Sequence, residues 1–254
     1  NAGLCAGVNP QTRGAESVVE GFYIESGVDD VVIDGFKIVS ATFEGSGYVR
    51  AIGVQGSGHT IENNLLVGPE DLGSQAEGGI GIEFIAGDND DTELVCNEVY
   101  GWYSGVYVNP SNGHLFESNH FHGNYVGIGS DGLSDVEIRS NVFNGNTEGF
   151  GSSNVGDDVT ARFNVFAGNS QQGIGQYSTG SIDAKYNWWG CNEGPSTLSG
   201  ECDAITGTVT FDPWLVLNLV ADPTSVLAGT GTSELVADLT YNSDNLPTSG
   251  LGNV

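Results

Sequence analysis

Ile138-Arg139-Ser140-Asn141-Val142-Phe143-Asn144-Gly145-Asn146 is one of several similar stretches that recur along this chain of 254 residues. Their shared feature is an asparagine at the fourth position, preceded and followed by apolar residues. The steps between these asparagines are 33, 22, 22, 23 and 23 residues, and the positions are Asn64, Asn97, Asn119, Asn141, Asn164 and Asn187. A period of about 20 to 50 residues is typical of stacked units that cannot bury their apolar faces alone.

The repeating unit consists of short strands joined by turns. Its apolar residues alternate over four to six positions, which favours strands over helices, as in Ile80-Gly81-Ile82, Val106-Tyr107-Val108, Ile128-Gly129 and Ile174-Gly175. Glycine also recurs twice per repeat, and we expect both sets at corners with a left-handed backbone. One set comes before the strand and the other after it: Gly79, Gly105, Gly127, Gly149 and Gly173; Gly68, Gly101, Gly123, Gly145 and Gly168.

The recurring asparagines predict a hydrogen-bonded ladder. Strands of neighbouring repeats stack about 4.8 Å apart, so an amide side chain can donate to one neighbour and accept from the other. Such a ladder would satisfy buried backbone groups at the turn. A second, shorter ladder is predicted for Asn124, Asn146, Asn169 and Asn192.

These repeats resemble the right-handed parallel β-helix repeat proteins, the superfold that includes pectate lyases and many secreted or surface proteins. The resemblance covers roughly residues 18–215, with seven repeats if Ile33 to Ile38 is counted, where Phe36 replaces the asparagine. It implies an all-β solenoid of residues 18–215 behind an N-terminal cap of residues 1–17. It does not imply an activity, because one superfold hosts many functions.

The C-terminal part changes character after the last repeat. Residues 187–195 and 209–215 resemble the closing segment of bacterial and archaeal surface β-helices, where large aromatics plug the coil; here these are Trp188, Trp189 and Trp214. Residues 216–254 resemble the first strands of a bacterial invasin-type immunoglobulin-like repeat. That sandwich needs about seven strands, so we expect an incomplete immunoglobulin-like segment that connects one subunit to the next.

The charge of the chain limits its partners. Six basic residues against 33 acidic ones give a formal charge of −27, which argues against nucleic acid or an anionic membrane. No apolar run reaches the roughly 18 residues of a membrane span, and the chain opens at Asn1 without any methionine. We therefore expect a processed, exported protein that is extracellular or at the cell surface.

The four cysteines support this expectation. Cys191 and Cys202 flank a short loop after the last repeat and are predicted to form a disulfide in an oxidising compartment. Cys96 lies within a repeat, and we expect an ordinary buried thiol there. A pairing of Cys96 with Cys5 stays open.

Two acidic groups are candidates for calcium binding. The first resembles the alternating oxygen pattern of calcium loops, and the second places acids at one corner of successive repeats. The alternative is turn chemistry, because aspartate readily caps its own loop backbone. The candidate ligands are Asp88, Asp90, Asp91 and Glu93 in the first group and Asp135, Asp157 and Asp158 in the second.

Two further outward-facing groups of residues are candidates for binding. Arg139, Arg162 and Lys185 hold half of all basic residues and could contact an anionic sugar or the acidic flank of a neighbouring subunit. The alternative is local balance by acids such as Glu117. His120 and His122 share one face of a strand, but the sequence places no third ligand, so an ordinary surface pair is the favoured interpretation.

The predicted function is that of an extracellular structural protein, a homopolymeric subunit of a surface layer or filament without catalytic residues. The alternatives are a carbohydrate-binding adhesin that uses the inserted segments 40–48, 68–78 and 87–91, and a polysaccharide lyase or hydrolase. For an enzyme, the one grouping that can be assembled is Arg139 and Arg162 with Asp135 and Asp158. These residues lie around a corner from one another, so we expect no catalysis.

Overall fold

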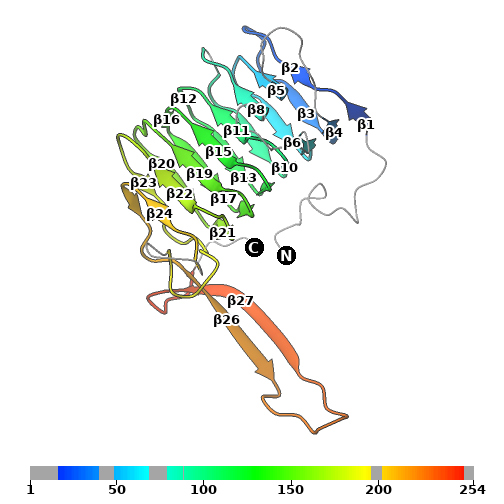
Figure 1. Cartoon of the computed structure of the whole chain (residues 1–254), viewed down its shortest axis with the longest axis vertical. Helices are drawn as coiled ribbons and strands as arrows, with labels where there is room; N and C mark the ends of the chain where they lie inside the picture. Colours follow the sequence, from blue (N-terminus) through cyan, green and yellow to red (C-terminus); the bar gives the residue numbers. More distant parts are fainter. Residues whose placement is uncertain (1–16, 40–48, 69–78, 88, 196–201, 249–254) are drawn as a thin grey trace.

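The computed structural model describes residues 17–39, 49–68, 79–87, 89–195 and 202–248. These residues form a stack of coils in which each coil adds one strand to each of three parallel sheets (Figure 1). The all-β fold and its parallel β-helix are therefore confirmed. None of the described residues forms a helix long and apolar enough to cross a membrane.

The three long sheets run the length of the stack. Sheet A contains β1 (Ser17–Val19), β4 (Phe36–Val39), β7 (Leu65–Val67), β10 (Glu98–Tyr100), β14 (His120–His122), β18 (Val142–Asn144) and β21 (Val165–Ala167). Sheet B contains β2 (Phe22–Tyr23), β5 (Arg50–Val54), β8 (Ile80–Phe84), β11 (Ser104–Val108), β15 (Val126–Ser130), β19 (Glu148–Ser152), β22 (Gln172–Gln176) and β24 (Ile205–Thr206). Sheet C contains β3 (Val32–Asp34), β6 (Thr60–Glu62), β9 (Glu93–Val95), β13 (Leu115–Glu117), β17 (Val136–Arg139), β20 (Val159–Arg162), β23 (Ile182–Asp183) and β25 (Val209–Thr210).

Two small sheets complete the fold. β12 (Ser111–Asn112) and β16 (Leu133–Ser134) pair in parallel on the connection between sheets B and C. β26 (Leu215–Asp222) and β27 (Glu234–Asn242) form an antiparallel hairpin after the last coil. The described residues beyond Trp214 thus contain two strands, not the seven of an immunoglobulin-like sandwich.

The core is built from side chains that stack from coil to coil. The middle residues of the sheet A strands point inward, and Phe121, Phe143, Phe166 and Trp189 form a continuous column in which neighbouring rings lie nearly parallel. Their ring centroids are 5.1, 4.8 and 5.1 Å apart, and all four side chains are fully buried. The alternation of apolar residues in the sequence reflects this column directly.

The predicted asparagine ladder lies at the corner between sheets C and A. Each amide nitrogen donates to the amide oxygen of the next coil at 3.0–3.1 Å, from Asn64 through Asn187. The same oxygen accepts the backbone N–H of the preceding ladder residue, as between Asn119 and Asn141 at 2.8 Å. The ladder therefore satisfies backbone groups that the corner would otherwise leave buried without partners.

The left-handed backbone at this corner falls on non-glycine residues. The residue before each ladder asparagine has a positive φ of 55–59°: Asn63, Cys96, Ser118, Ser140, Phe163 and Tyr186. Of the glycines expected at corners, Gly101, Gly123, Gly145 and Gly168 also have a positive φ. The set before the strand does not, and the register places Gly81 rather than Gly79 in that column.

The glycines of sheet B are required by close packing instead. A Cβ on Gly127 would lie 2.5 Å from the carbonyl oxygen of Gly149 and 2.9 Å from the ring of Phe143. Neighbouring coils therefore approach too closely for any side chain, so the expectation of a left-handed corner was wrong for this column.

The second ladder ends differently from the prediction. Asn124 donates to Asn146 and Asn146 to Asn169, but Asn169 then donates to Asp203 rather than to Asn192. Burial raises the pKa of the Asp203 carboxyl, although hydrogen bonds from Asn169 and Gly168 oppose this shift. A carboxylate suits the end of the ladder because it accepts the hydrogen bond from Asn169 and has no N–H of its own that would need a partner in a further coil.

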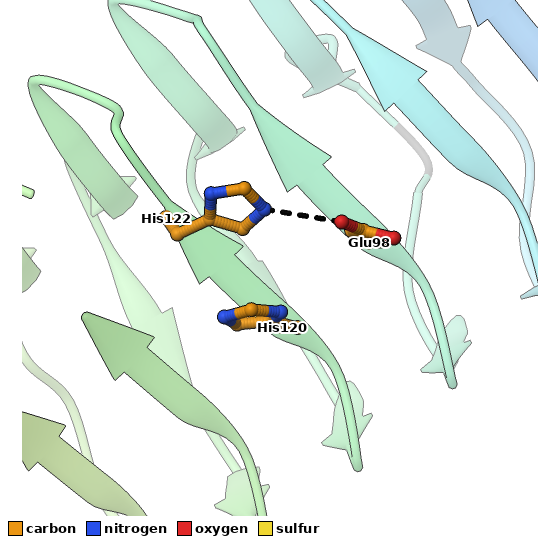
Figure 2. Close-up of side chains that lie close together, drawn as sticks. All are labelled: Glu98, His120 and His122. Carbon is orange, nitrogen blue, oxygen red and sulfur yellow. Dashed lines mark hydrogen bonds and ion pairs between the residues drawn. The ribbon is translucent and has the colours of Figure 1, made fainter. Parts of the chain in front are cut away.

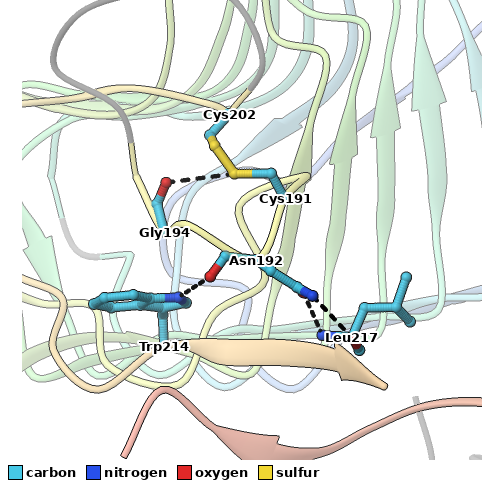
Figure 3. Close-up of a disulfide and its surroundings, with 6 residues drawn as sticks. All are labelled: Cys191, Asn192, Gly194, Cys202, Trp214 and Leu217. Carbon is cyan, nitrogen blue, oxygen red and sulfur yellow. Dashed lines mark hydrogen bonds between the residues drawn. A yellow bond between two sulfur atoms is a disulfide. The ribbon is translucent and has the colours of Figure 1, made fainter. Parts of the chain in front are cut away.

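The C-terminal end of the stack is closed by aromatics and a disulfide (Figure 3). Cys191 and Cys202 are joined as predicted, with their Cα atoms 5.3 Å apart. The indole of Trp214 covers Gly194 and donates to the carbonyl of Asn192 at 3.0 Å. Trp189 is buried, but Trp188 is half-buried in line with the outer face of sheet A and does not contribute to the plug.

Cys96 is disulfide-bonded, which corrects the expectation of an ordinary buried thiol. Cys5 lies outside the described residues, as do most of the proposed N-terminal cap of residues 1–17 and the insertions 40–48 and 69–78.

Candidate functional site

The outer face of sheet A carries a group of potential metal ligands (Figure 2). The other such group among the described residues contains Cys191 and Cys202, whose sulfur atoms form a disulfide. His120 and His122 lie two residues apart on β14, so both point outward. β10 is the neighbouring strand, and its Glu98 lies opposite His120 in the parallel register. The potential ligand atoms of the three side chains all lie within 4.8 Å of one another.

Neighbouring side chains hold the two imidazoles in place. Nε2 of His122 lies 3.2 Å from Oε1 of Glu98, and the ring of Tyr100 stacks on His122 at 4.8 Å. Nε2 of His120 lies 2.6 Å from Oδ1 of Asn144 on β18. Burial lowers the pKa of His120, which favours the neutral form of this imidazole.

Glu98 is the member of this group that the sequence analysis did not single out. It follows the ladder residue Asn97, as His120 follows Asn119, so the alignment of repeats already placed the two side by side. Reading down each outward column, in addition to reading along each strand, would have found the third ligand.

The proposed calcium ligands are not gathered into a comparable group. Neither set brings three carboxylates within 4.8 Å of one another in the part of the chain that the structure describes, and Asp88 lies outside that part. Asp90 accepts hydrogen bonds from the backbone and side chain of Asn112, and Glu93 is exposed on sheet C. Calcium binding at Asp90, Asp91 and Glu93 stays a prediction.

The second acidic set lies in the turns that form one corner of successive coils. Asp135 and Asp158 both have a φ of 52°, and the N–H of Asp135 donates to the carbonyl of Asp157 at 2.9 Å. Asp91 and Gly113 have a positive φ at the same corner of earlier coils, which fits the role of aspartate in left-handed turns. Calcium binding by Asp135, Asp157 and Asp158 likewise stays a prediction.

The outward basic column forms as expected on sheet C, where Arg139 lies opposite both Glu117 and Arg162. Its charges are balanced locally. Arg139 contacts Glu117 at 3.0 Å and Glu137 at 3.6 Å. Arg162 pairs with Asp183, which Lys185 also approaches at 4.0 Å. A partner at this column would have to compete with these internal ion pairs.

One buried carboxyl group lies on the outer face of sheet B. Glu148 is 7% exposed and accepts hydrogen bonds from Gln172 at 2.7 Å and from the hydroxyl of Tyr177. A Cβ on Gly151 or Gly175 would lie 2.7 or 2.3 Å from this carboxylate, so both glycines make room for it. Burial raises the pKa of Glu148 despite the two hydrogen bonds.

This pKa shift predicts how Glu148→Gln changes the pH dependence of stability. A carboxyl with a raised pKa binds more protons in the folded state, so the free energy of unfolding falls as the pH rises above the ordinary value of glutamate. We expect the stability of the unmodified protein, relative to Glu148→Gln, to decrease from acidic to neutral pH. Urea unfolding at several pH values measures this difference, and a constant or rising difference would contradict the expectation.

A polar groove crosses the β12–β16 corner between sheets B and C. Its volume is about 620 Å³, and its lining includes Asp90, Ser111, Asn112, Asp131 and Asn154. Tyr107 stands on the neighbouring part of sheet B and donates to Asp131 at 2.7 Å. The lining of the groove combines carboxylates, amides and hydroxyls, which is a chemistry that suits hydroxyl-rich ligands.

The coils, the ladders and the all-parallel sheets define a right-handed parallel β-helix. The family model described as "Right handed beta helix region" matches residues 21–188, which is more than half of the chain. The chain therefore belongs to this family. No curated protein and no solved structure matches the chain.

Proposed function

We propose that this protein is a structural subunit of an extracellular layer or filament, joined to further copies of itself through the β26–β27 hairpin. The family is compatible with enzymes and with non-enzymes alike, so the proposal rests on features of this chain. The observation that carries it is the hairpin, which extends away from the closed end of the stack (Figure 1).

The hairpin exposes apolar side chains that would be covered if a second copy packed against it. Leu219 is 64% exposed, Leu235 is 66% exposed, and Leu227 near the tip is 80% exposed. In register, Leu219 lies opposite Ala237 and Leu235 opposite Ala221. A two-stranded hairpin is marginal in water, and each free strand edge is a template for pairing with another strand.

The base of the hairpin is fixed to the β-helix, which suits a connector. The amide of Asn192 donates to the carbonyl of Leu217 at 3.1 Å and accepts its N–H at 2.8 Å (Figure 3). Ser243 donates its N–H to the carbonyl of Trp214 at 2.8 Å. Strands anchored in this way transmit force between a neighbouring copy and the stack.

Three other features support the proposal. The Cys191–Cys202 disulfide fits an oxidising, extracellular environment. Arg139 and Arg162 are paired with Glu117 and Asp183, while Asp135 and Asp158 lie in turns at the other end of β17 and β20, so the four residues form no catalytic group. Contact between the hairpin and a different surface of the next copy produces an open filament when the rotation between copies does not close a ring.

The test is the self-association of charge variants. We expect the mass of the unmodified protein to increase with concentration in light-scattering experiments, and the double variant Leu219→Lys with Leu235→Lys to remain monomeric, because charged edges block strand pairing. The matched control is Thr230→Lys with Thr232→Lys, which adds the same charge to the exposed turn and is expected to assemble. A monomeric unmodified protein, or a Leu219/Leu235 variant that assembles normally, would refute the proposal.

The second candidate is a carbohydrate-binding adhesin, which the groove at β12–β16 favours. Its polar lining would accept the hydroxyls of a surface polysaccharide. Binding of neutral glycans that is lost in Asn112→Ala, with assembly unchanged, would support this candidate.

A further inference from the structure

We propose that Glu98, His120 and His122 bind a divalent transition metal ion of the zinc class on the outer face of sheet A. This site is independent of the hairpin and of the proposed assembly. It rests on three side chains from two neighbouring strands whose potential ligand atoms all lie within 4.8 Å of one another.

The donor set selects the class of metal. Two imidazoles and one carboxylate suit Zn²⁺, Co²⁺, Ni²⁺ or Cu²⁺, whereas Ca²⁺ and Mg²⁺ require shells made of oxygen atoms. The acidic surface attracts any cation in a diffuse way, but among the residues that the structure describes only this set offers two imidazoles with a carboxylate. Selectivity for zinc over calcium therefore separates the site from general attraction by a charge of −27.

The geometry needs only a small adjustment to hold an ion. Zinc bonds of about 2.0–2.2 Å in a tetrahedral site place neighbouring donor atoms about 3.4 Å apart. Nε2 of His122 and Oε1 of Glu98 are already 3.2 Å apart. The donor atom of His120 lies within 4.8 Å of the other two, and rotation of its side chain toward them would complete the set.

The surroundings resemble the supporting shell that metal sites require. A ligating histidine usually donates its other ring N–H to an acceptor, which fixes its tautomer and orientation. Oδ1 of Asn144 is positioned to accept from Nε2 of His120, and Nδ1 then keeps its lone pair for the metal. Tyr100 packs flat on His122 and limits the rotation of that ring.

Three protein ligands leave a coordination position open. The three side chains are half-buried and lie on the outside of the sheet, so water or a group from another molecule can reach the ion. Sites of this type differ from closed structural sites, which use four protein ligands.

Calorimetric titration with zinc chloride in the presence of excess calcium tests the proposal. We expect one zinc ion per chain, and an affinity more than about 100-fold lower in His120→Gln and in His122→Gln, with about a 10-fold loss in Asn144→Ala through the supporting hydrogen bond. The control Glu117→Gln removes a comparable carboxylate from sheet C and should bind zinc normally. Cobalt, used as a spectroscopic probe, should show absorption bands that disappear in the histidine variants.

The histidine variants should fold, because both rings are half-buried on the surface, and thermal unfolding without metal checks this. The proposal is overturned if calcium abolishes zinc binding to the unmodified chain. It is equally overturned if folded His120→Gln and His122→Gln retain the affinity and the cobalt spectrum.

Discussion

Replacing Asn141 with alanine is expected to lower the free energy of unfolding by about 3 to 5 kcal/mol, because a central step of the ladder is lost. Oδ1 of Asn141 accepts from both the backbone and the side chain of Asn119, and its amide donates to the carbonyl of Phe116 at 2.8 Å and to Asn164 at 3.0 Å. Alanine would leave buried donors and a buried carbonyl without partners, and each of these costs about 1–3 kcal/mol.

Chemical unfolding of the Asn141→Ala variant measures this loss. Asn144→Ala is the matched control, because it removes the same side chain from the exposed end of β18 in the same coil. We expect its stability to change by no more than about 0.5 kcal/mol. Equal stability losses in the two variants would show that the ladder does not determine the stability of the stack.

Replacing Phe143 with alanine is expected to cost about 3–5 kcal/mol, for a reason that involves packing alone. The ring is fully buried between Phe121 and Phe166, and it packs against the backbone of Gly127. Coils held at the spacing of hydrogen-bonded strands cannot collapse into the space that the ring leaves, so most of the cavity would remain.

The control for Phe143→Ala is Val142→Ala, which shortens the neighbouring, half-buried side chain on the outer face of the same strand. We expect a loss below about 1 kcal/mol from this change, measured by the same unfolding experiment. A loss below about 1 kcal/mol for Phe143→Ala would contradict the view that the aromatic column forms the core.

The sequence was sufficient for features that repeat in every coil. The spacing of the ladder asparagines determined the register, which the pairings of Asn64 through Asn187 confirm. The same spacing implies that Glu98 and His120 are neighbours on adjacent strands, which becomes evident only when equivalent positions of successive repeats are compared. Contacts within a column follow from the period because each coil repeats the one before it.

Features at the ends of the repeat could not be predicted in the same way. Asp203 replaces Asn192 at the end of the second ladder because the chain leaves the regular path after Trp189. The glycine column was misaligned at Gly79 because Gly79 and Gly81 both precede an isoleucine, and the strand pairing places Gly81 in the column. The immunoglobulin-like character of the C-terminal segment stays a prediction, because alternating residues such as Leu219 and Leu235 indicate strands and two paired strands are compatible with several folds.

Hydrogen exchange of the hairpin at low and high protein concentration tests the central claim most directly. Half of the amides in each strand of a two-stranded sheet face away from the partner strand, so they exchange freely unless another strand adds to the edge. We predict that amides of β26 and β27 become protected as the concentration rises, while amides of β15 and β19 inside the stack do not change. Exchange in the hairpin that is the same at every concentration would contradict the assembly of these subunits through β26 and β27.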